Sequence, residues 1–367
     1  MKITRVKAFQ VTLPLSEGYW LHGGRLFFDE LDSTIVSIET DAGLTGWGES
    51  CPWGATYLPA FGKGLRAGIE ELAPQLLGQD PRRVGVIERL MDEALPGHPY
   101  VKSALDVACW DILGQASGLA VCELLGGRSE EPVTLHSSIP TGTPEAMLAS
   151  IAKARAKGYR IHSCKLGADV QGDVERIRGI VAGLEPDESL TFDANRGWLP
   201  DQAIGVMNAT GDVQAYFEQP CETFEECLTV RRLTRQPIVL DECLQSYGDV
   251  VRAQAEGACE AIGLKLGRVG GLSKARRIRD FCVAMGIRLN IEDTGGSIIA
   301  DTAAVHLAHS TPASHRRGAW LCHDMITVDT ADGGARNEGG VTRAPEAPGL
   351  GVQPHAEVLG VPVAVYG

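Results

Sequence analysis

Hydrophobic residues follow one period at the start of the chain and another further on. In the first fifty residues, alternating apolar and polar positions predict strands over 3–13, 34–40 and 44–49. The last two strands are joined by a short turn that contains Gly43, which is typical of a hairpin. Between the first two strands, EGYWLHGGRLFF is expected to form a loop whose aromatic residues are exposed, and such loops often carry function.

From about residue 65 to residue 125 the apolar residues are spaced three and four apart, which predicts packed helices. The strongest such segment is VKSALDVACWDILGQASG, and its final residue, Gly118, suits the end of a helix. Strands followed by packed helices predict a separate α+β domain over residues 1–127.

From Val133 onward, strand patterns and helix patterns alternate. Eight strands can be counted, beginning with VTLHSSI and ending with GAWLCHD. Alternating βα units predict a parallel sheet, and eight of them predict a closed (β/α)8-type TIM barrel, class α/β, over residues 128–328. An open doubly wound sheet is the alternative, but its glycine-rich phosphate loop does not follow the first strand. Residues 329–367 are rich in glycine and proline, and we expect them to pack back on the N-terminal domain.

Composition narrows the partners of this protein. Hydrophobic residues make up 44% and charged residues 22%, as in ordinary globular proteins, and the net charge of −13 argues against nucleic acid or anionic membranes as partners. No apolar run reaches the roughly 18 residues of a membrane span, and the N-terminus resembles a strand rather than a signal peptide. The ten cysteines include no CxxC pair, which favours reduced core thiols and a cytoplasmic location.

Single charged residues close five successive strands of the predicted barrel, at nearly constant spacing. They are Lys165, Asp193, Glu218, Asp241 and Lys265, on strands 2 to 6. Catalytic groups of such barrels lie at the C-terminal ends of strands. Strands 2 and 6 are opposite each other in a ring of eight, so the two lysines should face each other with the carboxylates on the arc between them.

Three converging carboxylates would repel one another unless a cation lay between them. Oxygen ligands without a nearby His or Cys favour Mg²⁺ over zinc. Such an ion would accept a substrate carboxylate and stabilise the ene-diolate formed when the adjacent carbon loses its proton. A lysine can act as the base if its pKa falls from about 10.4 toward about 7 to 8. The opposing interpretation, isolated surface charges at strand ends, does not account for five in register.

The KLGRVGGL run at 265–272 and the Asp-Glu pair at 241–242 resemble the enolase superfamily, and within it the mandelate racemase/muconate-lactonising enzyme group. The resemblance covers nearly the whole chain. It implies an α+β capping domain and a modified (β/α)7β barrel, with cap segments 19–24 and 51–57 covering the site. It also implies Mg²⁺ bound by Asp193, Glu218 and Asp241, with Lys165 and Lys265 as paired bases.

One residue departs from the family pattern. The lysine-type subgroups carry Lys-x-Lys on strand 2, whereas this chain has Ser163-Cys164-Lys165. The lost lysine would lower the pKa of Lys165 and bind a substrate carboxylate, so the change weakens the case for the cycloisomerase and dipeptide-epimerase members.

The runs PWGATYLPAF, LPGHPYVKSALDVACWD and PGLGVQP resemble instead the branch of cis-3-hydroxy-L-proline dehydratases and hydroxyproline betaine epimerases. Aromatic residues would then wall a small cyclic ammonium, and acidic residues after strands 7 and 8 would pair with it. The substrate contacts expected on this basis are Trp20, Tyr57, Ser163, Asn195, Asp293, Trp320 and Asp324.

The expected activity is Mg²⁺-dependent removal of the α-proton of a small amino-acid-like carboxylate, leading to dehydration of cis-3-hydroxy-L-proline. Epimerisation of proline betaine or 4-hydroxyproline betaine is the alternative. A sugar-acid dehydratase is a third candidate, but it would need a His-Asp pair where this chain has Lys265. A catalytically silent binding protein on the same fold is the candidate from another class. Soluble enzymes commonly form symmetric assemblies, so a homo-oligomer is expected.

Overall fold

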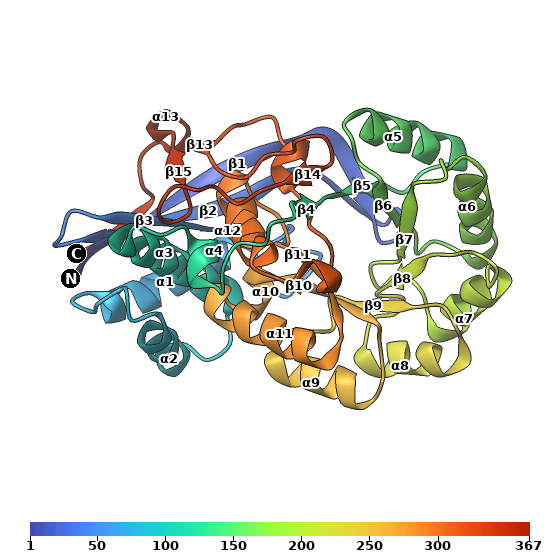
Figure 1. Cartoon of the computed structure of the whole chain (residues 1–367), viewed down its shortest axis with the longest axis horizontal. Helices are drawn as coiled ribbons and strands as arrows, with labels where there is room; N and C mark the ends of the chain where they lie inside the picture. The colour runs from blue at the N-terminus through green and yellow to red at the C-terminus, as the bar shows by residue number, and fades with distance from the viewer.

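Eight parallel strands follow one another around a barrel in their order along the chain, in the computed structural model of residues 1–367 (Figure 1). The His136 N–H donates to the carbonyl of Ala319, and the Ala319 N–H donates to that of Thr134, so the last strand joins the first and the sheet closes. The predicted barrel is confirmed. Its strands are β5 (His136–Ile139), β6 (Ile161–Lys165), β7 (Ser189–Asp193), β8 (Tyr216–Glu218), β9 (Ile238–Leu240), β10 (Ala261–Lys265), β11 (Arg288–Glu292) and β12 (Arg316–Gly318).

Seven helices connect these strands, which gives the (β/α)7β arrangement. Several begin at a residue whose side-chain oxygen accepts a backbone N–H of the first turn, as Thr143, Asp169, Thr223 and Ser246 do. The helices are α5 (Pro144–Ala156), α6 (Val170–Ala182), α7 (Pro200–Ala209), α8 (Phe224–Leu233), α9 (Tyr247–Ala255), α11 (Leu272–Met285) and α12 (Ile298–His309), and a short α10 (Leu266–Val269) follows β10 directly.

An antiparallel sheet and three longer helices lie beside the barrel (Figure 1). The sheet has the order β16-β1-β2-β3, from β1 (Ile3–Leu21), β2 (Leu26–Thr40), β3 (Thr45–Ser50) and β16 (Ala364–Tyr366). The helices are α1 (Gly62–Leu76), α2 (Val84–Ala94) and α3 (Pro99–Ser117), followed by the one-turn α4 (Val121–Leu124). As the sequence predicts, α3 ends at a glycine, because Gly118 adopts φ +70°.

The segment expected to be a loop between the first two strands is instead a long hairpin. Strands β1 and β2 remain paired out to Leu21 and Leu26, with Tyr19 opposite Phe28 and Trp20 opposite Phe27. Successive side chains of a strand point to opposite faces. Tyr19 is therefore buried, whereas Trp20 is 43% exposed and packs against Phe27, with ring centroids 4.7 Å apart.

The tip of this hairpin reaches the barrel. The Gly23 N–H donates to the carbonyl oxygen of Leu166 at 2.8 Å, and Nδ1 of His22 lies 2.8 Å from the carbonyl oxygen of Asn195. Gly23 has φ +65°, and a Cβ there would lie 2.2 Å from the carbonyl oxygen of Gly167. A residue without a side chain is therefore required where the hairpin meets the loop after β6.

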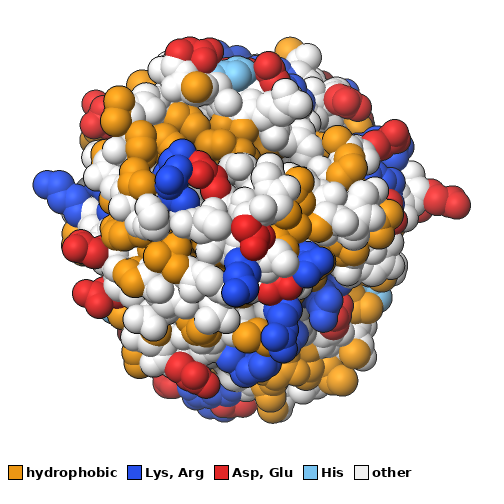
Figure 2. All heavy atoms as spheres, turned by 90° about the vertical axis from the view of Figure 1, so that its left-hand side faces the viewer, with side chains coloured by type: hydrophobic (Ala, Val, Ile, Leu, Met, Phe, Trp, Pro, Cys, Tyr) orange, Lys and Arg blue, Asp and Glu red, His pale blue; other side chains and the backbone are white.

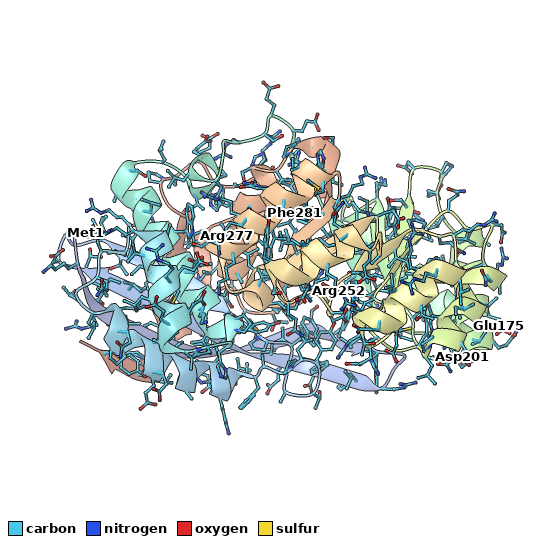
Figure 3. All side chains as sticks on the ribbon, turned by 90° about the horizontal axis from the view of Figure 1, so that it is seen from below. Met1, Glu175, Asp201, Arg252, Arg277 and Phe281 are labelled. Carbon is cyan, nitrogen blue, oxygen red and sulfur yellow. The ribbon has the colours of Figure 1, made fainter.

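Polar contacts also join the cap to the barrel. Glu49 of β3 accepts hydrogen bonds from the backbone N–H groups of Ser297 at 2.8 Å and Ala300 at 3.0 Å, so it caps the N-terminus of α12. Arg277 of α11 pairs with Glu88 of α2, and Figure 3 shows Arg277 where α11 faces the capping helices. The two bodies are thus held in a fixed relation.

The C-terminal segment returns to the cap. Strand β16 pairs antiparallel with β1, and Leu359 lies in the apolar core of the cap. On the way, three further short strands form: β13 (Ala331–Gly333) pairs with β15 (Val352–Pro354), and β14 (Val341–Thr342) pairs with β4 (Val133–Thr134), while the one-turn α13 (Ala356–Leu359) precedes β16.

The surface of the cap carries side chains of both charges. On the face of the cap that Figure 2 shows, Lys and Arg side chains lie beside Asp and Glu side chains instead of forming one uniform basic field. All ten cysteines are free thiols, and eight of them are buried. No helix combines the length and the apolar character that crossing a membrane would require.

Substitution of Gly23 by Ala should loosen the hairpin tip. The added Cβ meets backbone atoms that have little room to move, and overpacking of this kind costs about 1–3 kcal/mol. Trypsin should therefore cleave after Arg25 faster in Gly23→Ala than in the wild type. Gly24→Ala is the matched control, because Gly24 also has positive φ but a Cβ there meets nothing within 4 Å. Equal cleavage rates in the two variants would show that the tip is not docked.

Candidate active site

The five charged residues singled out in the sequence lie together at one mouth of the barrel. Lys165, Asp193, Glu218 and Lys265 are the last residues of β6, β7, β8 and β10, and Asp241 immediately follows β9. In the parallel register, Lys165 is opposite Asp193, which is opposite Glu218. Neighbouring strands therefore bring a base and two acids side by side.

Most of these groups are held by ion pairs. Lys165 donates to Asp193, and the backbone N–H of Asn195 also donates to Asp193 at 2.8 Å. Across the barrel, Nζ of Lys265 lies 3.3 Å from Asp241 and 3.2 Å from Glu292. A guanidinium from α10, that of Arg268, also pairs with Asp241. The approach of Asp241 depends on Gly263, where a Cβ would lie 2.4 Å from Oδ1 of Asp241.

The neighbouring carboxylates act on both lysines. Burial by itself lowers the pKa of Lys165, but the charges of Asp193, Tyr19 and Glu218 outweigh it and hold the pKa well above its ordinary value. For Lys265, burial again lowers the pKa, and Asp241 and Glu292 raise it to a net value above the ordinary one. The lower lysine pKa expected from the sequence is therefore absent here, because the carboxylates raise each lysine pKa by more than burial lowers it.

Glu218 is the member of the set without a partner. Its side chain is buried and makes neither a hydrogen bond nor an ion pair. Burial, then the charges of Asp193 and Asp241, raise the pKa of Glu218 well above its usual range. Such a group needs a proton or a cation beside it.

The donor set fits a hard cation. Besides Glu218, Oδ2 of Asp241 is buried without a hydrogen bond and has only the ion pair with Lys265. All three predicted ligands are carboxylates, the oxygen donors that Mg²⁺ prefers. With Lys165 on Asp193 and Arg268 on Asp241, no group of three or more His, Cys, Asp or Glu side chains has the arrangement of a metal site. Mg²⁺ binding by these residues would therefore require the carboxylates to exchange protein cations for the metal.

A chamber of about 50 Å³ lies between the two lysines and is covered by the cap. Tyr19 and Leu21 of the hairpin, and Trp53 and Tyr57 of the segment after β3, close it from above. Tyr57 donates to Glu242, which also accepts from Nδ2 of Asn195 at 3.2 Å. Of the substrate contacts expected from the sequence, the lining contains Tyr57, Ser163, Asn195 and Trp320.

Three expected substrate contacts lie outside this chamber. Trp20 is on the outer face of the hairpin, because strand alternation turns it away from Tyr19. Asp293 follows the end of β11 and is directed to the backbone, where it accepts from the N–H groups of Gly267 at 3.0 Å and Thr294 at 2.7 Å. Asp324 accepts from the hydroxyl of Tyr159 and lines a neighbouring cavity.

Sequence reasoning did not single out Glu292 or His136, and it placed Trp53 only within the covering segment 51–57. Glu292, the last residue of β11, lies between Lys265 and His136, with Nε2 of His136 3.1 Å away. Trp53 packs on Trp320 with ring centroids 5.9 Å apart, and its indole N–H is buried without an acceptor. The rule that strands end in functional residues would have selected Glu292 over Asp293. No comparable signal marks His136, and the resemblance marks Trp53 only as part of segment 51–57.

Comparison with known families gives two matches that together span most of the chain. Residues 29–126 match "Mandelate racemase / muconate lactonizing enzyme, N-terminal domain", and residues 146–358 match "Enolase C-terminal domain-like".

Individual proteins that are similar to this chain support the same family assignment. A cis-3-hydroxy-L-proline dehydratase of Roseibium aggregatum is 44% identical over 366 residues, covering 100% of both chains. An N-succinyl-L-Arg/Lys racemase of Bacillus cereus is 28% identical over 84% of this chain and 85% of its own. A crystal structure of an enolase superfamily member from Roseovarius nubinhibens, complexed with magnesium, has a TM-score of 0.95 and 52% identity, and covers 100% of this chain and 99% of its own.

Mg²⁺ should stabilise the wild-type protein against heat, and Glu218→Gln should abolish the effect. At an ion concentration about 100 times the Kd, binding adds about 2.7 kcal/mol to the free energy of unfolding. In a chelator, Glu218→Gln should unfold at a higher temperature than the wild type, because it removes a buried charge without a partner. Glu175→Gln, on the exposed face of α6 (Figure 3), is the control and should keep the Mg²⁺ effect. A full Mg²⁺ shift in Glu218→Gln would exclude Glu218 as a ligand.

Proposed function

Because the chain belongs to the mandelate racemase/muconate lactonizing enzyme group of the enolase superfamily, we propose that it is a Mg²⁺-dependent dehydratase of cis-3-hydroxy-L-proline. It is an enzyme, and its characterised relatives are lyases and isomerases. The observation that carries the choice of reaction is the pair of lysines that face each other across the chamber, each at the end of its strand.

Opposed lysines suit this substrate for a stereochemical reason. In a cis-3-hydroxyproline the hydroxyl group lies on the same ring face as the carboxylate, so the α-proton lies on the other face. Removal of the proton and departure of the hydroxyl group therefore require a base on one side of the ring and an acid on the other. Lys165 and Lys265 supply one group to each side.

Three carboxylates would hold the metal: Asp193, Glu218 and Asp241. Bound there, Mg²⁺ supplies positive charge that stabilises the enolised substrate carboxylate and offsets the negative charge that raises the pKa of the lysines. The crystal structure of the Roseovarius nubinhibens relative, which is complexed with magnesium, supports this choice of ion.

The proton transfers then balance as follows. One lysine, in its neutral form, takes the α-proton, and the electron pair of the broken C–H bond forms a Cα=Cβ bond. The Cβ–O bond breaks, and the opposite lysine, in its ammonium form, gives a proton to the departing hydroxyl group, which leaves as water. The remaining enamine tautomerises to a cyclic imine with a C=N bond. Neither an oxidant nor a reductant is needed.

The chamber favours a small cyclic substrate. Its small volume, about 50 Å³, argues against an extended substrate such as a dipeptide or a succinylated amino acid. Trp53 and Trp320 form an aromatic wall that can attract the ring ammonium. The unpartnered indole N–H of Trp53 can donate to a substrate oxygen, and Ser163 leaves space on β6 where a lysine would stand.

Epimerisation of proline betaine or 4-hydroxyproline betaine is the second candidate, because two opposed lysines can also exchange a proton across one carbon. The racemase and epimerases among the relatives support this alternative. A sugar-acid dehydratase is disfavoured by a lysine at position 265.

Incubation in D₂O with Mg²⁺ separates the candidates. With cis-3-hydroxy-L-proline we expect a product that contains a C=N bond, detected by NMR. The trans-3-hydroxy isomer is the control: its α-proton and hydroxyl group share one face, so it should be dehydrated at least about 100-fold more slowly. Deuterium at Cα of a betaine, without dehydration of cis-3-hydroxy-L-proline, would favour the epimerase instead.

Replacement of each lysine by Met should assign the two roles. The variant that lacks the base should lose both α-proton exchange and dehydration, by about 10²-fold or more. The variant that lacks the acid should lose dehydration while it retains part of the exchange. Lys157→Met, an exposed lysine beyond α5, is the control and should keep both activities. Normal dehydration in either active-site variant would refute the two-lysine mechanism.

A further inference from the structure

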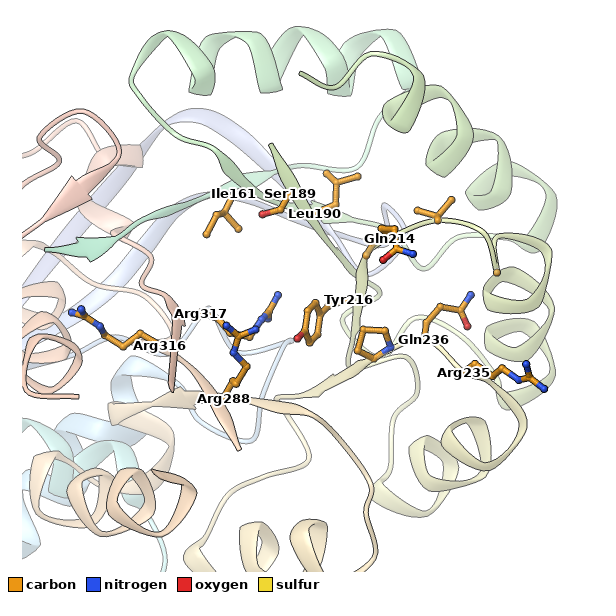
Figure 4. Close-up of a pocket in the computed structure, with 14 residues that line it drawn as sticks. Ile161, Ser189, Leu190, Gln214, Tyr216, Arg235, Gln236, Arg288, Arg316 and Arg317 are labelled. Carbon is orange, nitrogen blue, oxygen red and sulfur yellow. The ribbon is translucent and has the colours of Figure 1, made fainter. Parts of the chain in front are cut away.

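A second and larger cavity, of about 550 Å³, lies at the opposite mouth of the barrel (Figure 4). Its lining includes the first residues of five strands: Ile161, Ser189, Tyr216, Arg288 and Arg316. The candidate active site uses the last residues of the strands, so the two sites lie at opposite ends of the barrel. The proposed dehydration makes no use of this second cavity.

Four arginines line the cavity, and no acidic residue does. In Figure 4, Arg288 and Arg317 lie together beside the ring of Tyr216, with Arg316 on one side and Arg235 across the opening. None of the four takes part in an ion pair, although the chain has many ion pairs and a net charge of −13. A concentration of unpaired positive charge in an acidic protein calls for a physical reason.

Part of the hydrogen-bonding capacity of these arginines is unused, although Nη2 of Arg316 donates to Oγ of Ser129 at 3.4 Å and to the carbonyl oxygen of Glu131 at 3.2 Å. Arg317 stacks on Tyr216, with its guanidinium carbon 3.7 Å from the ring centroid, and donates once to Thr191 at 3.0 Å. Its Nη1 is buried without an acceptor, and so is Nη1 of Arg316. The side chains of Arg235 and Arg288 make no hydrogen bond at all. Buried donors without acceptors are costly, and an anion would satisfy them.

The pKa of Arg317 also indicates repulsion among the arginines of the cavity. Burial lowers the pKa of Arg317, and the charge of Arg288 lowers it further, while the attraction of Glu218 opposes both. That attraction reaches Arg317 from within the barrel, and the charge of Glu131 acts on Arg316, but neither carboxylate lines the cavity. A multiply charged anion in the cavity would relieve the mutual repulsion.

We propose that this cavity is a binding site for a small phosphorylated molecule, a phosphate monoester or a diphosphate. Guanidinium groups bind phosphate oxygens through paired N–H donors, and a phosphate group brings close to two negative charges and three strong acceptors. The rest of the lining suits an attached organic group, because Leu190, Val213 and Pro237 are apolar and Gln214 and Gln236 offer amides. The volume exceeds that of the phosphate group alone.

Isothermal titration calorimetry with inorganic phosphate and with pyrophosphate, in the presence of a chelator, tests the site. We expect saturable binding of one anion per chain, with pyrophosphate tighter than phosphate. Arg317→Gln should weaken binding by about tenfold or more, because it removes a charge-assisted donor. Arg288→Gln, at an exposed position, should weaken it in the same direction and guards against misfolding of the first variant.

Two controls decide where the anion binds. Arg89→Gln removes an exposed and unpaired arginine of α2, so it tests the effect of net charge alone and should leave the affinity unchanged. Lys265→Met tests the active-site mouth and should also leave the affinity unchanged.

Four results would overturn the proposal. They are the absence of saturable heat with either anion, affinity unchanged in both Arg317→Gln and Arg288→Gln, loss of binding in Lys265→Met instead, or tighter binding of malonate than of pyrophosphate. None of these measurements depends on turnover, so the site can fail while the proposed dehydratase stands, and the reverse.

Discussion

Mutual repulsion among buried carboxylates is the constraint on which the rest of the site depends. Parallel register sets Asp193 beside Glu218, and Asp241 directly follows the end of the next strand, β9. In this low-dielectric position the three charges are tolerable only with positive partners nearby. Lys165, Lys265 and Arg268 supply part of that charge, and Glu218 remains without a partner. The two lysines that would perform the chemistry thus also offset part of the negative charge of the carboxylates.

The barrel and its strand-end charges could be predicted from the sequence because both follow from simple periodic rules. A strand-and-helix unit has a nearly fixed length, so acids and bases repeated at that spacing must fall on one edge of a parallel sheet. The direction of a side chain beyond a strand end follows no such rule. Asp293 was expected to face the substrate, yet one residue past β11 the chain turns and its carboxylate accepts two backbone N–H groups, whereas Glu292 keeps the inward direction.

The cap was harder to predict because its role depends on contacts that are distant in sequence. Glycine and aromatic residues between positions 18 and 28 are typical of a loop, but pairing of Tyr19 with Phe28 extends the hairpin to the barrel. Only then does alternation decide that Tyr19 enters the chamber and Trp20 does not. The docking of Gly23 against residues 166 and 167 could not be read from either segment alone, since neither carries a motif for the other.

The two mouths of the barrel have opposite electrostatic needs. One gathers more carboxylates than its lysines and Arg268 can neutralise without a metal, and the other is lined by arginines and by no acidic residue. Arg317 couples the two mouths electrostatically, because it lines the arginine cavity and its guanidinium is attracted by the charge of Glu218. The attraction favours the ionised form of Glu218, which is the form that a metal ligand requires. An arginine at the far mouth therefore belongs to the electrostatic balance of the active site even though it lines no part of the chamber.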